Sequence, residues 1–534
     1  MENNTQTQKR TFEGFDGHIN WGIRLAYAGG DVACNIVFGM IGTLLTFFYT
    51  EVAGINAGVI GLIMLGSRVF DGFSDVIMGI IVEKTHSRWG KARPWLLWMS
   101  VPFCASAVIL FTVPQVPQNL DWVKILYVIV TYNFCTTVCY TAINLPYGTL
   151  STFMTRSSHE RDMIGNVRMG LSPLGKILAV FGTPFLVAGM GGESDQGAWA
   201  KAMLVWASVG LILLLINFIF CKENVNPELE KKSLEAKKEE SKVKKLPMRK
   251  GLKFLIKNQY FWAVLLLWMF QSVSFGVVGT TLPYYNKYVL NMPDTQYSWF
   301  FLVETLTLVG GVFVCMPLIK KVGKRNLALG GAIIALLGQV MFAVFTYTVS
   351  ATNLPMLYAI CVIRSIGLAP LNAVVFGMLG DVVDFGHWKN GVRQEAFISA
   401  GGSVGTKLGS GLASVVITQL LNYAGYVEGG KAQTEGTINM MKSLYVWGPL
   451  AIAVGVTLVL IFYQLDKKYD AMMLALTKRE WEETSKAKSV QKDIAKVEKK
   501  PAPIDPEIAK MMKEMKPLEG KENPIKNTEN KKKK

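Results

Sequence analysis

Two carboxylates, Asp71 and Asp75, lie four residues apart in an otherwise apolar segment of the chain. Side chains at this spacing share one face of an α-helix, so the two carboxylates can bind the same object. Their oxygens, with Ser74 and Thr141 as further oxygen ligands, suit a hard monovalent cation such as Na⁺. The pair is also suited to share a proton, because two close carboxylates do not both ionise cheaply. These residues predict a cation site and leave the choice between Na⁺ and H⁺ open.

A second set of polar residues lies in other apolar segments and suits the recognition of a sugar. Asp31 can accept hydrogen bonds from neighbouring hydroxyls, and the guanidinium of Arg168 donates a rigid fork of hydrogen bonds. The aromatic faces of Tyr27 and Tyr140 can stack on a pyranose ring. Asn144 follows Tyr140 by four residues and therefore shares its helix face. We predict that these five residues bind the substrate.

A purely structural role is the alternative for both sets. Asp71 and Asp75 can form salt bridges with Arg68 or Lys407 that join helices without any transport. The two charges of the sugar set can likewise bond to each other between helices. An ionisable group near the middle of a bilayer costs at least about 2 kcal/mol, so each one is treated as a candidate functional residue.

Composition and hydropathy predict the elements that position these residues. The chain has 534 residues, of which 51% are hydrophobic and 18% charged, and its mean hydropathy is +0.29. Apolar runs of roughly 20 residues, enough to cross about 30 Å of hydrocarbon, recur along the chain. We expect an all-α membrane protein with twelve transmembrane helices, near residues 22–49, 56–83, 94–114, 122–150, 166–190, 200–222, 259–290, 296–319, 326–349, 354–383, 395–425 and 440–464. The seven cysteines form no CxxC pair and are expected to be free, buried thiols.

The net charge of +17 follows the predicted topology. Loops after even-numbered spans are rich in Lys and Arg, whereas loops after odd-numbered spans carry few cations. By the positive-inside rule, the basic loops and both termini are cytoplasmic, and the protein is expected in the plasma membrane, the inner membrane of a cell that has two. This distribution favours the lipid bilayer over nucleic acid as a partner. A monomer is expected.

The basic loop after the second span is the candidate inner gate. It carries Arg88, Lys91 and Arg93. We expect these cations to close the cytoplasmic side of the transporter against helix ends and acidic partners such as Asp381 and Asp384.

Two features divide the chain into halves. One is a long polar linker, and the other is a short turn of glycine and cations at 89–93 that recurs at 322–325. Such turns at corresponding places are typical of duplicated transporter bundles, in which the substrate binds at the midplane between the halves. The expected organisation is a cytoplasmic N-terminus at 1–21, a six-helix half at 22–222, a cytoplasmic linker at 223–258, a second six-helix half at 259–464 and a basic cytoplasmic tail at 465–534.

Several motifs taken together resemble one transporter family. They are Asp71-xxx-Asp75-xxx-Gly79 followed by Ser87-Arg88-Trp89-Gly90-Lys91-xx-Pro94-Trp95, then Tyr49-Thr50-Glu51-Val52, Asn144-Leu145-Pro146-Tyr147-Gly148 and Asp384-Phe385-Gly386-His387-Trp388-Lys389. This set, spread over about residues 20 to 465, resembles the glycoside-pentoside-hexuronide:cation symporters. That family is a branch of the major facilitator superfamily and includes melibiose permease.

The resemblance implies the major facilitator fold and roles for individual residues. Asp71, Asp75 and Thr141 match positions of the family's cation site, and Lys407 matches a lysine close to that site. Asp31 and Arg168 match positions that contact the sugar. Ser74 replaces an Asn of the melibiose branch, which raises the chance of H⁺ coupling and leaves the choice between Na⁺ and H⁺ open. Asn144 replaces a sugar-binding Asp. The Asn-Leu-Pro-Tyr-Gly motif is similar to glucuronide and xyloside carriers, so a glycoside of a pentose or a uronic acid is favoured over melibiose.

These observations predict a secondary active transporter that carries a sugar together with Na⁺ or H⁺ by alternating access, with no cofactor besides the coupling ion. The alternatives are a cation-dependent lysolipid carrier of the same fold and a transport-inactive sensor or scaffold that uses the tail. An enzyme is not expected. The stretch 170–176 opens like a phosphate loop, but Ile177 replaces the required Ser or Thr, and the sequence has no HExxH motif.

Overall fold

The computed structural model describes residues 19–85, 87–117, 120–155, 158–223, 255–348, 353–390, 395–429, 432–469 and 471–476. Nearly all of these residues are helical, which confirms the predicted all-α class. The chain divides into a compact unit that ends at Tyr469 and a second unit that begins at Asp470. Most of the expected linker and tail, and almost all of the expected N-terminal segment, lie outside the described residues.

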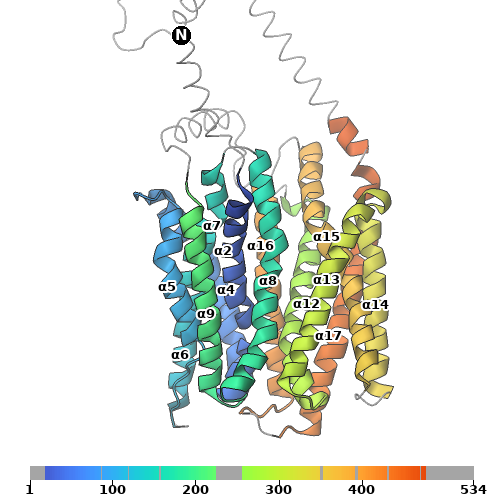
Figure 1. Ribbon diagram of the computed structural model, residues 1–534. Helices are drawn as coiled ribbons and strands as arrows, with labels where there is room; N and C mark the ends of the chain where they lie inside the picture. The colour runs from blue at the N-terminus through green and yellow to red at the C-terminus, as the bar shows by residue number, and fades with distance from the viewer. Residues whose placement is uncertain are drawn as a thin grey trace, which may run out of the picture. The chain divides into compact units, whose positions relative to one another are not determined.

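The first group of helices runs from residue 21 to residue 220 (Figure 1). It contains α2 (Trp21–Thr43) with α3 (Leu45–Phe47) and the π-helix η1 (Phe48–Val52), α4 (Ala57–Lys84), α5 (Arg93–Ile109), α6 (Asp121–Asn133) with the π-helix η3 (Phe134–Cys139) and α7 (Tyr140–Met154), α8 (Ser158–Met190) and α9 (Gln196–Phe220).

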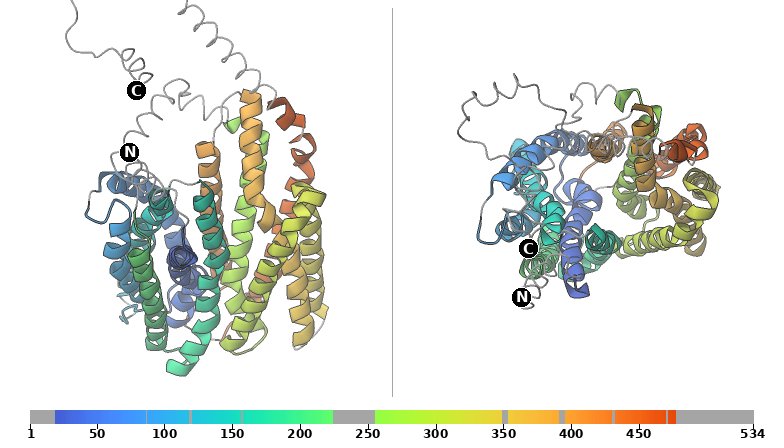
Figure 2. Two further views of the ribbon diagram at one scale, coloured as in Figure 1. Left: turned by 45° about the horizontal axis from the view of Figure 1, so that its top comes forward. Right: turned by 90° about the horizontal axis from the view of Figure 1, so that it is seen from above.

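The second group repeats this order from residue 259 to residue 462. It contains α12 (Gln259–Tyr284) with the π-helix η4 (Tyr285–Val289), α13 (Asp294–Val322), α14 (Lys324–Thr348), α15 (Leu354–Asn390), α16 (Glu395–Tyr423) and α17 (Glu435–Phe462). Figure 2 shows the blue-to-green helices of the first group beside the second group, whose colours run from light green through yellow to orange-red.

Nine of the described helices are long and apolar enough to cross a membrane. The remaining long helices are α4, which carries the central charges, α5, which has 17 residues, and α16. They complete two sets of six along the chain, and the count of twelve spans stays a prediction. All seven cysteines are free and buried, as expected.

Helix contacts are concentrated within each group. In the first group α2 packs on α8 and α9, and in the second α15 packs on α13 and α14. Across the two groups, α4 contacts α16, α8 contacts α13, and α2 contacts α12. Residues on these three pairs of helices therefore face the interface between the groups. The domain boundaries predicted from the sequence remain a prediction.

Small residues allow α8 to approach α2 closely. A Cβ atom at Gly175 would collide with the backbone carbonyl of Val32. This contact explains the glycine in the stretch that opens like a phosphate loop, because small residues at helix interfaces let two backbones come together.

The two basic turns have the same geometry. The backbone N–H of Arg93 donates to Glu223 (2.7 Å), and that of Arg325 donates to Asp466 (2.6 Å). Each guanidinium also donates to two carbonyls at the C-terminal end of a helix, α9 for Arg93 and α17 for Arg325. The faint repeat in the sequence is therefore a repeat of structure.

A second repeat involves two of the three π-helices, η1 and η4. η1 follows α2 and α3, and η4 follows α12. Two residues after each of them the chain has a positive φ, 65° at Gly54 and 52° at Asn291. Positive φ is unfavourable for most side chains, so the shared turn shows that both helices end in the same way.

Candidate functional site

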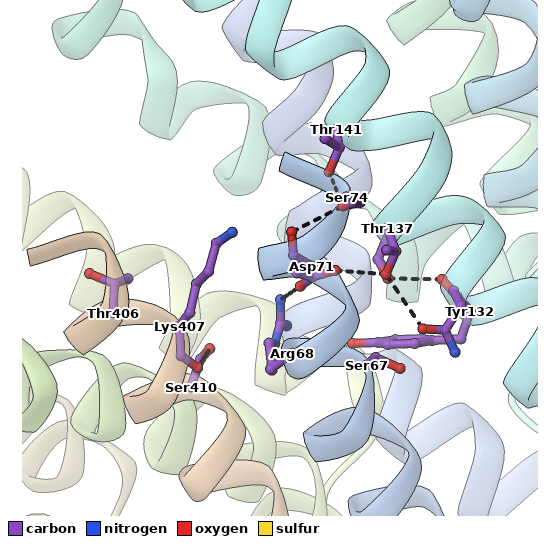
Figure 3. Close-up of polar contacts among 12 residues, drawn as sticks. Ser67, Arg68, Asp71, Ser74, Tyr132, Thr137, Thr141, Thr406, Lys407 and Ser410 are labelled. Atoms are coloured by element: carbon purple, nitrogen blue, oxygen red, sulfur yellow. Dashed lines mark hydrogen bonds and ion pairs between the residues drawn. The ribbon is translucent and has the colours of Figure 1, made fainter. Parts of the chain in front are cut away.

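Asp71 of α4 lies at the centre of a polar cluster (Figure 3). It is 6% exposed. Its Oδ2 atom lies 3.1 Å from NH1 of Arg68, and its Oδ1 atom accepts a hydrogen bond of 2.6 Å from Thr137. Thr137 belongs to η3. The carboxylate is therefore held by one cation of its own helix and one hydroxyl of a neighbouring helix.

Asp75 lies one turn further along α4 and reaches the other group of helices. It forms an ion pair with Lys407 of α16, and Thr141 of α7 donates to it over 3.4 Å. The side chains of Lys407 and Asp75 are 37% and 39% exposed. A cation that approaches Asp75 has to compete with the ammonium of Lys407.

Ser74 completes this cluster. Its hydroxyl donates to the backbone carbonyl of Asp71 (3.0 Å) and lies 3.2 Å from the hydroxyl of Thr141. The structure thus brings together all five residues of the predicted cation site, from α4, α7 and α16. Arg68 and Lys407 are also the partners named by the structural alternative, so the binding role stays a prediction. No group of three or more His, Cys, Asp or Glu side chains able to hold a metal ion lies in the part of the chain that the structure describes.

Asp31 and Arg168 of the predicted sugar set meet between α2 and α8. Nε of Arg168 lies 3.5 Å from Oδ2 of Asp31. The guanidinium also lies over the ring of Tyr147, 5.1 Å from its centroid. Both charges are thus held on one side of the bundle, with the arginine half-buried.

Tyr27 takes part in packing instead of presenting a free ring. It is 1% exposed and stacks on Tyr147, with ring centroids 4.7 Å apart and an interplanar angle of 17°. Each hydroxyl donates to the other residue's backbone carbonyl, at 3.0 and 2.7 Å. Tyr27 therefore supports the aromatic ring beneath Arg168, and its predicted contact with a sugar has no support from this geometry.

The two remaining residues of the sugar set lie on α7. Tyr140 is half-buried and packs on Phe38, with ring centroids 3.9 Å apart. Asn144 is half-buried and has no hydrogen-bond partner among the described residues. An amide that is partly accessible and free of partners is able to bind a ligand hydroxyl.

The cations of the predicted gate lie in contacts within the first group. Arg88 stacks on the ring of Trp89, 4.2 Å from its centroid. The backbone N–H groups of Lys91 and Arg93 both donate to Glu223. These contacts fix the turn at the end of α4.

The acidic residues of the predicted gate bond within the second group. Asp381 pairs with Lys324 at 2.5 Å, and Asp384 accepts a hydrogen bond of 2.8 Å from Tyr469. The partners of these two carboxylates that the structure describes lie in the second half of the chain. The role of both sets as a gate stays a prediction.

Sequence reasoning missed a cluster around Glu51 at the other end of the bundle. Glu51 of η1 is 6% exposed and pairs with Lys287 of η4 at 2.7 Å. Tyr288 donates to it at 2.7 and 2.8 Å, and Tyr426 is a further donor. Burial, with the nearby Tyr284 and Glu51, raises the pKa of Tyr426. The sequence contains a signal for this cluster, because Glu51 is an acidic residue at the end of an apolar span.

A buried ion pair in the second group was also missed. Arg364 of α15 is 3% exposed and pairs with Glu304 of α13, with Tyr445 at 3.1 Å. An arginine and a glutamate inside apolar spans are a signal of the kind that singled out Asp71.

Helices of this length and polarity, with charged residues paired between two groups of six, define a membrane transporter of the major facilitator fold. A solved structure of a D-xylose-proton symporter has this fold, with a TM-score of 0.56 at 12% identity over 81% of this chain and 97% of that one. The chain belongs to the family of MFS/sugar transport proteins, which it matches over residues 26–467.

Two relatives extend this comparison. The isoprimeverose transporter of Lactiplantibacillus pentosus is 31% identical over 473 residues, which cover 88% of this chain and 94% of the relative. The inner membrane symporter YicJ of Escherichia coli is 29% identical over 427 residues, 80% of this chain and 88% of the relative. These findings confirm the predicted family, the transporter fold and a multi-pass membrane protein rather than an enzyme.

Proposed function

We propose that the protein is a symporter that carries a sugar glycoside across the plasma membrane together with Na⁺ or H⁺. The family of MFS/sugar transport proteins supports the class. The names of the two relatives support symport, a sugar substrate and an inner membrane location. They give no support to the lysolipid alternative. The basic turns and both termini face the cytoplasm, as the positive-inside rule predicts.

The observation that carries the coupling mechanism is the ion pair between Asp75 and Lys407. It joins α4 of the first group to α16 of the second. A cation that binds at Asp75 weakens this pair, because it takes over the negative charge that holds Lys407. Asp71, Ser74 and Thr141 supply the remaining oxygen atoms for Na⁺, whereas a proton needs only one carboxylate.

The sugar binds beside this site, between the two groups of helices. Asp31 and Arg168 recognise its hydroxyls, Asn144 supplies a free amide, and Tyr140 borders the space on α7. Binding energy from both ligands then favours the movement of one group against the other, as in other duplicated transporters.

Alternating access requires the contacts at the two ends of the bundle to open in turn. The Glu51 cluster closes the external end between η1 and η4. Its ion pair and hydrogen bonds have to break before a sugar enters from outside.

Transport assays in proteoliposomes test this proposal. Uptake and counterflow of xylosides, galactosides and glucuronides are measured at varied Na⁺ and pH. We expect at least one sugar to be taken up only with a cation gradient, and Asp71→Ala to abolish that dependence. If cation-dependent uptake survives Asp71→Ala, the assignment of Asp71 to the cation site is wrong. Transport of lysolipid without any sugar would contradict the whole proposal.

A further inference from the structure

Lys176 is a charged residue that the proposed mechanism does not use. It lies near the middle of the membrane-spanning part of α8, Glu160–Met190, and is half-buried. A lysine at the centre of a transmembrane helix is costly to insert into a bilayer. Such a residue needs a partner or a function.

The contact between α2 and α8 is a ladder with steps of four residues. The first step is the ion pair of Asp31 with Arg168 at 3.5 Å. The second is the hydrogen bond that Asn35 donates to Ser172 at 2.9 Å. Both steps join a polar group of α2 to a polar group of α8.

The third step joins Lys176 to a glycine. A Cβ atom at Gly39 would lie 3.0 Å from Cα and Cγ of Lys176, so the lysine stem runs against the backbone of α2. On its other side the ammonium lies 5.7 Å from the ring centroid of Phe301 in α13. Because α8 and α13 belong to different groups, the charge lies at the interface where the proposed substrate binds.

No acidic side chain compensates this charge within the described residues. The three central carboxylates are already paired, Asp31 with Arg168, Asp71 with Arg68 and Asp75 with Lys407. The opposite charges within each pair cancel, so the charge of Lys176 is an excess positive charge beside them. A coupling cation increases this excess, and an anionic ligand removes it.

We propose that Lys176 binds the negative charge of an acidic sugar, the carboxylate of a uronic acid glycoside. Lys176 lies two helical turns, about 12 Å along the axis, from Arg168. The hydroxyls of the sugar bind at Asp31 and Arg168, and its carboxylate reaches towards Lys176. This inference rests on the proposed sugar transport and narrows its substrate class.

Two substrates that differ only in the carboxylate test this role. Uptake of 4-nitrophenyl β-D-glucuronide and 4-nitrophenyl β-D-glucoside is compared in proteoliposomes that contain the full chain. The wild-type protein is expected to prefer the glucuronide. Lys176→Met is expected to lower glucuronide uptake by about tenfold or more, as for the loss of a hydrogen bond to a charged group, and to leave glucoside uptake unchanged.

Two further variants separate binding from folding. Lys176→Arg keeps the positive charge and is expected to retain most of the glucuronide uptake. Lys201→Met removes an exposed lysine of α9 and is expected to change neither substrate.

The outcomes distinguish this inference from the proposed function. Sugar uptake in which the wild type prefers the neutral glycoside, or an equal loss of both sugars in Lys176→Met, overturns the role of Lys176 and leaves sugar symport intact. No cation-dependent uptake of any sugar overturns the proposed function and this inference together.

Discussion

At the scale of residues, the two central carboxylates are held by different partners. Asp71 bonds to Arg68 and Thr137 in the first group, whereas Asp75 bonds to Lys407 in the second. Asp71 is thus held within the first group of helices. Of these two carboxylates, only Asp75 forms a contact between the two groups. In the proposed mechanism we therefore expect the two carboxylates to have separate tasks: Asp71 fixes the ion, and Asp75 couples its binding to movement.

Thr137 provides a first test at this scale. Thr137→Val removes the 2.6 Å hydrogen bond to Asp71. We expect the cation concentration for half-maximal uptake to rise about tenfold, because a hydrogen bond to a charged group contributes about 1.5–3 kcal/mol. Sugar counterflow at saturating cation measures the remaining activity.

Thr136→Val is the matched control. Thr136 is also buried, but its hydroxyl bonds to the backbone carbonyl of Tyr132 in the preceding turn (2.9 Å). It is expected to leave cation activation unchanged. Equal effects of the two variants would contradict a specific role for Thr137.

At the scale of elements, the π-helices η1 and η4 form the contact that we propose closes the external end. Thr50 of η1 lies 2.6 Å from the hydroxyl of Tyr284, which directly precedes η4, and Glu51 pairs with Lys287. The two π-helices lie at the ends of equivalent helices of the two groups, so corresponding segments supply both sides of the contact.

Glu51→Gln is expected to favour the state that is open to the outside. The amide keeps the size of the side chain but leaves Lys287, which is 26% exposed, without its partner charge. We expect the closed state to lose about 1–3 kcal/mol. Thr43 is buried against α12, so a cysteine substituted there becomes accessible only when this end opens. The measurement is the rate at which that cysteine reacts with a membrane-impermeant maleimide added outside.

Glu428→Gln serves as the control for this variant. Glu428 also accepts a hydrogen bond between the two groups, from Asn56, but that bond is exposed to solvent. Exposed polar contacts contribute little, so labelling at Thr43 should stay at the level of the parent protein. Unchanged labelling in Glu51→Gln would rule out the proposed closure.

At the scale of the whole molecule, we expect transport to be a property of the unit that ends at Tyr469. The family match ends at residue 467, and the compact unit ends two residues later. We therefore expect a chain truncated after residue 476 to take up sugar at the rate of the full chain, in proteoliposomes matched for protein content. Loss of uptake, with normal membrane insertion, would favour the sensor or scaffold reading of the tail.

Much of the fold follows from the sequence, because insertion into a bilayer depends on local hydropathy. Apolar runs marked the helices, and the duplicated basic turn marked the two groups. The sequence also singled out Asp71, Asp75, Asp31 and Arg168, since a charge in an apolar run stands out wherever it pairs.

Only the tertiary structure decided which charges meet. Asp75 and Lys407 are 332 residues apart and pair because α4 packs on α16. The same packing placed Tyr27 in a stack with Tyr147. It also placed Lys176 opposite Gly39, with no carboxylate partner in the part of the chain that the structure describes. The physical reason is that the cost of burying a charge depends on the apolar helix that carries it, which the local sequence shows. The partner that offsets this cost comes from segments distant in the sequence, which only the folded structure brings together.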